Sequence, residues 1–131
     1  MSSTTTHDRL DKRRRLQAIL SRDGPQCFWC AVPFDDGSRV ATTEHLVPRL
    51  KGGPSWMENE VAACKPCNQR RGHTALGAWL VQCQQRGYPS RPAEVLSRLA
   101  ALSAAIERRG GQRRARRYIA SQNRRLRKMT P

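Results

Sequence analysis

Four of the five cysteines stand in two Cys-x-x-Cys pairs, Cys27/Cys30 and Cys64/Cys67, with 33 residues between the pairs. A two-residue spacer lets both thiolates of a pair face one ion, so two such pairs predict a tetrahedral zinc site. Two disulfides or a redox-active pair would use the same residues. Disulfides are disfavoured because segment 1–15 is polar and basic and lacks the apolar stretch of a secretory signal. A redox role leaves the second pair unexplained, so we expect one structural zinc ion.

Four further residues, Glu44, His45, Asn59 and Asn68, lie between the pairs or directly after them and suit phosphodiester hydrolysis. A neutral imidazole, with an ordinary pKa near 6.5, is a suitable general base at neutral pH, so we predict this role for His45. Carboxylate and amide oxygens are ligands that Mg²⁺ and Mn²⁺ prefer. Neighbouring side chains of an extended segment leave on opposite sides, so Glu44 and His45 can take different roles. Asn68 could instead cap a helix that begins there.

The charge of the chain favours a polyanionic partner. Lysine and arginine total 25 against 10 acidic residues, a formal net charge of +15, and arginine suits the geometry of phosphate. No acidic residue follows Glu107, whereas the basic residues after it are Arg108, Arg109, Arg113, Arg114, Arg116, Arg117, Arg124, Arg125, Arg127 and Lys128. We expect DNA as the partner, with RNA as the other candidate. Solvated helix faces, a membrane-surface helix or a docking surface for an acidic protein are the alternatives.

The first half of the chain shows signals for a helix followed by two strands. A helix capped by Thr6 is expected to run to about Ser21 and to end at the Asp-Gly-Pro sequence of residues 23–25. Residues 39–43 and 60–63 favour short strands, with a turn at 51–54 between them. Glu44 and His45 would then directly follow the first strand.

The second half is expected to be helical. Leu76, Trp79, Leu80 and Cys83 recur at helical spacing, which places the Cys83 thiol in the core. Further helices are expected over about 92–109 and, after Gly110-Gly111, towards the end of the chain. The last helix would pack on the core or fold only on nucleic acid.

At this point the sequence resembles a known family. The segments 27–30 (Cys-Phe-Trp-Cys), 43–49 (Thr-Glu-His-Leu-Val-Pro-Arg), Gly52-Gly53 and 59–72 resemble the HNH endonucleases of the ββα-metal class, over residues 27 to about 73. The resemblance implies an α+β fold: a small ββα-metal core of two antiparallel strands and a helix around one catalytic ion, Mg²⁺ or Mn²⁺, held together by the separate four-cysteine zinc site. Flanking N- and C-terminal helices complete the expected fold.

The resemblance also implies roles for the residues. Glu44, where the family more often has Asp, and Asn68 are expected to hold the catalytic ion, and Asn59 to brace the loop that carries His45. The expected activity is DNA hydrolysis that leaves a 5′-phosphate and a 3′-hydroxyl. The alternative is a non-catalytic, zinc-dependent nucleic-acid-binding module on the same fold. Phosphate or other nucleic-acid contacts are expected for Arg49, Lys51, Arg70, Arg71, His73, Arg113, Arg114, Arg116 and Arg117.

The chain of 131 residues is long enough for one compact domain with appendages. We expect a basic N-terminal helix in 1–22, the nuclease core in 23–90 and a basic helical extension in 91–131. Only 37% of the residues are hydrophobic, so zinc binding should contribute to folding. No apolar run approaches the ~20 residues that cross a bilayer. We therefore expect a cytoplasmic, nucleic-acid-associated protein of bacterial or phage type, as a monomer or homodimer.

Overall fold

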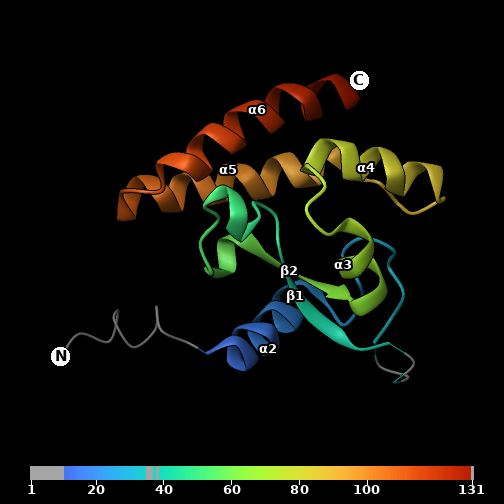
Figure 1. The fold of residues 1–131 in the computed structure, drawn as a ribbon. Helices are drawn as coiled ribbons and strands as arrows, with labels where there is room; N and C mark the ends of the chain where they lie inside the picture. The colour runs from blue at the N-terminus through green and yellow to red at the C-terminus, as the bar shows by residue number, and fades with distance from the viewer. Residues whose placement is uncertain (1–10, 35–36, 38, 131) are drawn as a thin grey trace.

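The computed structural model describes residues 11–34, 37 and 39–130, which form helices around a two-stranded sheet (Figure 1). No helix in this described part is long and apolar enough to span a membrane. In chain order the elements are α2 (Lys12–Asp23), β1 (Ala41–His45), the short 3-10 helices η1 (Arg49–Lys51) and η2 (Met57–Asn59), β2 (Glu60–Cys64), α3 (Lys65–Arg71), α4 (Leu76–Gln85), α5 (Pro92–Arg109) and α6 (Arg113–Met129).

The centre of the molecule is a ββα unit. Strands β1 and β2 pair antiparallel, with His45 opposite Glu60 and Glu44 opposite Val61. Helix α3 follows β2 without a break and contacts both strands. In Figure 1, α2 lies on one side of this sheet, whereas α4, α5 and α6 lie together beyond the other side. The α+β class with a ββα core and flanking helices is confirmed.

The first helix and the first strand differ from the sequence-based expectation. Helix α2 begins at Lys12, because the side chain of Asp11 accepts a hydrogen bond from the Arg14 amide at 2.8 Å and caps it. The expected cap, Thr6, lies outside the described residues. The helix ends at Asp23, as the Asp-Gly-Pro sequence predicted, and Gly24 there adopts a positive φ of 96°. Strand β1 spans Ala41–His45 rather than 39–43, so Glu44 and His45 lie within the strand.

Helices α5 and α6 form a hairpin that packs on the rest of the molecule. Gly110 and Gly111 both have positive φ, 81° and 75°, which turns the chain between the two helices. The apolar stripe of α5 and the buried side of α6 join one hydrophobic cluster with α4, β2 and the first cysteine pair. The last helix therefore belongs to the packed structure of the protein.

Candidate functional site

The four predicted cysteines come together at one end of the sheet. Cys27 and Cys30 lie in the turn after α2, Cys64 ends β2 and Cys67 lies in the first turn of α3. Their Sγ atoms all lie within 4.8 Å of one another, and all four are free thiols. Four sulfurs at about 2.3 Å from a tetrahedral zinc ion would be about 3.8 Å apart, and the Cys30 and Cys64 sulfurs are separated by 3.8 Å. The cluster therefore fits a zinc site with four cysteine ligands.

Hydrogen-bond donors around the cluster favour a thiolate at Cys27, whereas burial raises the pKa of Cys30 and the hydrogen bond to Cys27 raises the pKa of Cys67. The backbone amides of Trp29 and Cys30 point at the Cys27 sulfur, at 3.4 and 3.5 Å. The adjacent Cys67 thiol, together with these amides, lowers the pKa of Cys27 to about 4. Arg39 Nη1 lies 3.4 Å from the Cys64 sulfur and brings a positive charge to the cluster. Arg39 was not predicted from the sequence, because it precedes Cys64 by 25 residues.

Glu44 is buried on the face of β1 that α3 covers. Only 7% of the residue is exposed. Its Oε2 accepts a hydrogen bond from Trp29 Nε1 at 3.3 Å and lies 3.6 Å from Arg71 Nη1. Burial raises the pKa of Glu44, and the nearby Arg71 charge opposes that shift. Both of these contacts use Oε2, which leaves Oε1 as the oxygen that could bind an ion.

Asn68 lies in the middle of α3 and faces β1. Its Nδ2 donates hydrogen bonds to Thr42 Oγ1 at 2.9 Å and to the Thr43 carbonyl at 3.2 Å. Thr42 and Glu44 are two residues apart in a strand and so share one face. The Asn68 amide and the Glu44 carboxylate therefore lie on the same side of β1, and their oxygens are the hard donors that Mg²⁺ or Mn²⁺ prefers. The alternative capping role is wrong, because α3 begins at Lys65 with Cys64 as its N-cap.

His45 points to the other face of β1, as expected of neighbouring strand residues. Its Nε2 lies 3.1 Å from Ser55 Oγ and 3.6 Å from Glu60 Oε2. Burial, together with the positive charges of Arg49 and Arg15, lowers the pKa of His45 to about 4. The imidazole is therefore neutral at pH 7 and can accept a proton.

Glu60 is a neighbour of His45 that was not predicted from the sequence. It stands opposite His45 in the strand register and is 1% exposed. Its Oε1 accepts a hydrogen bond from Arg15 Nε of α2 at 2.8 Å, whereas its Oε2 is buried with no hydrogen-bond partner in the described part of the chain. The sequence offered one signal for Glu60: a carboxylate at the start of an otherwise apolar predicted strand, residues 60–63. Arg15 gave none, because it lies 45 residues away in sequence.

Asn59 makes the side-chain to backbone hydrogen bonds that were expected of it. It is fully buried; its Oδ1 accepts from the Val47 amide at 2.9 Å, and its Nδ2 donates to the carbonyls of Val47 and Pro54, both at 3.0 Å. A Cβ atom at Gly53 would collide with the Val47 carbonyl, so the second glycine of the pair is needed at this turn. Asn59 and Gly53 thus fix the loop that follows His45.

Arg71 requires a correction, because it does not reach solvent to contact phosphate. The residue is 1% exposed. Its Nη1 and Nη2 donate to the carbonyls of His45 and Leu46 at 2.7 and 2.9 Å, and its Nε donates to the Thr74 carbonyl at 3.2 Å. Arg71 therefore links the end of α3 to the strand that carries Glu44 and His45.

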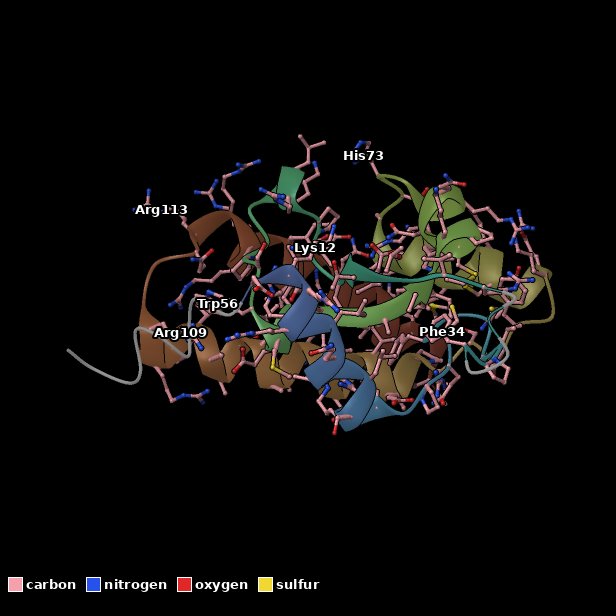
Figure 2. All side chains as sticks on the ribbon, turned by 90° about the horizontal axis from the view of Figure 1, so that it is seen from below. Lys12, Phe34, Trp56, His73, Arg109 and Arg113 are labelled. Atoms are coloured by element: carbon pink, nitrogen blue, oxygen red, sulfur yellow. The ribbon has the colours of Figure 1, made fainter. Side chains whose placement is uncertain are left out.

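The remaining predicted nucleic-acid contacts are exposed, but some of the arginines are engaged elsewhere. Eight of these residues lie on the surface: Arg49, Lys51, Arg70, His73, Arg113, Arg114, Arg116 and Arg117. Arg116 donates to Glu107 Oε1 at 3.0 Å and to the Gly111 carbonyl at 2.9 Å, at the turn between α5 and α6. Arg70 donates to Tyr88 Oη at 2.8 Å. Figure 2 shows His73 and Arg113 projecting along the same edge of the molecule as η1.

Comparison with known proteins agrees with this geometry. Residues 27–80 match the family model described as HNH endonuclease. A segment of 66 residues is 35% identical to part of the CRISPR-associated endonuclease Cas9 of Corynebacterium diphtheriae. This segment is 50% of the present chain and 6% of that protein. No solved structure matches the chain.

Proposed function

Because residues 27–80 match the HNH endonuclease family model, we propose that this protein is a metal-dependent endonuclease that hydrolyses DNA phosphodiester bonds. One observation carries the proposal. A neutral, half-buried His45 lies on one face of β1, whereas Glu44 and Asn68 lie together on the other face. These positions would let His45 act as a base while Glu44 and Asn68 hold an ion, without competition between them for that ion.

In this proposal His45 acts as the general base. A ring nitrogen of His45 takes a proton from a water molecule, whose oxygen attacks the phosphorus atom while the bond to the 3′-oxygen breaks. The 3′-oxygen then takes a proton from solvent, and the products are a 5′-phosphate and a 3′-hydroxyl. Glu44 and Asn68 would hold Mg²⁺ or Mn²⁺, which when bound supplies Lewis-acid stabilisation of the charge on the phosphate oxygens.

The other residues of the site orient these groups. Arg71 and Asn59 hold the carbonyls and amides of residues 45–47 in place, and Ser55 lies against the His45 ring. A zinc ion held by the four cysteines would join the turn after α2, which carries Trp29, to the β2–α3 junction, and would thereby help to hold Trp29 against Glu44. We assign zinc a structural role, separate from the catalytic ion.

The test is cleavage of supercoiled plasmid by the wild type and by His45→Ala, with Mg²⁺, Mn²⁺ or EDTA. We expect nicked or linear product only with a divalent ion, and a loss of about 10²-fold or more in the variant, the size typical of a missing general base. Equal zinc content and thermal stability of the two proteins would show that the variant is folded.

Metal-dependent cleavage that persists in His45→Ala would refute the assignment of the base. DNA binding by the wild type without cleavage under either metal would instead favour the non-catalytic nucleic-acid-binding module.

A further inference from the structure

An open groove of about 460 Å³ lies between η1 and α6, next to the first turn of α4. Its walls include three cationic side chains, two hydroxyls and no acidic side chain: Lys51, Arg114, Arg117, Tyr118 and Ser121, with Ala75 at the α4 end. Lys51 belongs to η1 together with Arg49, whose positive charge is near enough to act on His45, so the groove opens near the proposed site. Helix α6, in contrast, lies outside the residues that match the HNH family.

The walls of the groove are fixed by hydrogen bonds between its elements. The α4 helix has Ala75 at its N-cap and no capping side chain of its own. Tyr118 Oη and Gln122 Oε1 of α6 accept hydrogen bonds from the Leu76 and Gly77 amides instead, at 2.9 and 2.7 Å. Arg114 donates to the Leu50 carbonyl and so ties α6 to η1. The groove is therefore preformed.

Lys51 and Arg117 are the cations that the groove leaves available. Both are exposed, and neither side chain forms an ion pair or hydrogen bond with any other described residue. Arg114 is held by Leu50, as described above. Two unpaired cations beside hydroxyl groups, with no acidic side chain in the lining, suit a phosphate ligand.

The basic surface continues from the groove along α6. The buried side of this helix contains Ala115, Ile119 and Leu126. At 100° per residue, the opposite side presents an outer stripe, consisting of Arg113, Arg117, Arg124 and Lys128, over about 22 Å of helix. A DNA strand has one phosphate per 3.4 Å of duplex axis, so a stripe of this length can follow several phosphates.

We propose that the α6–η1 groove binds the phosphate backbone of the DNA substrate beside the scissile bond, with Lys51 and Arg117 as the contacts. The proposal rests on the proposed nuclease function and adds to it a substrate subsite made by a helix outside the HNH domain. Phosphate contacts position a duplex without selecting its sequence. The subsite should therefore strengthen binding of every duplex by a similar factor.

The test is the affinity for a short fluorescein-labelled DNA duplex, measured by anisotropy in EDTA over a range of salt concentrations. The groove variants are Lys51→Gln and Arg117→Gln, and the matched control is Arg86→Gln, which also removes one positive charge. Arg86 is exposed at the C-terminal end of α4, about 15 Å along the helix from the end that borders the groove. We expect each groove variant to raise Kd about fivefold to tenfold and to lower the salt slope by about 1, and Arg86→Gln to change Kd by less than about twofold.

The inference is overturned if both groove variants bind no more weakly than Arg86→Gln. Unchanged thermal midpoints should show that the variants are folded, since neither side chain makes a contact that folding needs. Because no cleavage occurs in EDTA, this result is independent of catalysis. If the wild type nicks DNA, His45→Ala does not, and the groove variants bind DNA as tightly as the wild type, only the groove proposal is rejected. If the groove variants bind DNA more weakly but the wild type never cleaves it, only the nuclease proposal is rejected.

Discussion

Replacement of Asn59 by Ala tests whether the loop after His45 is held by a single side chain. The change removes three hydrogen bonds, of 2.9, 3.0 and 3.0 Å, and leaves the Val47 amide and the carbonyls of Val47 and Pro54 without this partner. Val47 and Asn59 are both 0% exposed, so water cannot replace the bonds to Val47 without a rearrangement. A buried polar group that loses its partner costs about 1–3 kcal/mol, so we expect a loss of about 4 kcal/mol in the free energy of unfolding.

The assay combines thermal unfolding with plasmid nicking, and the matched control is Asn123→Ala. Asn123 lies on α6, and its side chain forms no hydrogen bond with the described residues. For a chain of this size, about 4 kcal/mol corresponds to a fall of about 15 °C in Tm. At temperatures where Asn59→Ala is still folded, nicking should fall by about 10²-fold, because a displaced catalytic group costs about that much.

The bracing role of Asn59 would be wrong if Asn59→Ala melted within about 3 °C of Asn123→Ala, which is less than about 1 kcal/mol. A variant that melted at lower temperature but nicked at the wild-type rate would show that the bonds stabilise the fold without orienting His45.

Two other predictions concern the zinc site and the pH dependence of stability. Cys64→Ser should lose zinc and melt well below the wild type. Cys83 lies in the apolar stripe of α4, so Cys83→Ser should keep one zinc per chain by metal analysis. Loss of zinc from Cys83→Ser would contradict the assignment of the ligands. Because burial lowers the pKa of His45 to about 4 from 6.5, only the unfolded chain binds this proton between those values. The contribution of His45 to stability is thus complete above pH 6.5 and is lost as the pH falls towards 4, by about 3 kcal/mol. Denaturant unfolding should show this loss in the wild type and not in His45→Gln, and superimposable pH profiles would refute it.

The N-terminal helix has a structural link to the site that its basic composition did not suggest. Arg15 binds Glu60, which faces His45, and Arg22 donates to the carbonyls of Met57 and Glu60 at 2.7 and 2.8 Å. Part of the positive charge of α2 therefore serves the interior of the protein.

The sequence by itself determined the features that depend on local spacing. The two Cys-x-x-Cys pairs predicted the cysteine cluster, because a two-residue spacer already directs both thiols of a pair to one point. The helical repeat of apolar residues predicted α4 and α5, and the glycines after them predicted where the chain turns. The separation of Glu44 from His45 onto opposite faces also followed from the period of a strand.

The tertiary structure alone decided which charged side chains are buried and what they contact. Arg71 and Arg70 are adjacent and identical in type, yet Arg71 is buried against the His45 and Leu46 carbonyls and Arg70 is exposed. Glu60 meets Arg15 across 45 residues, and Tyr118 meets Leu76 across 42. Such pairs form because packing of the apolar faces brings distant segments together and leaves their buried polar groups in need of partners. No local pattern specifies these pairs, and they determine which arginines are buried and which stay exposed.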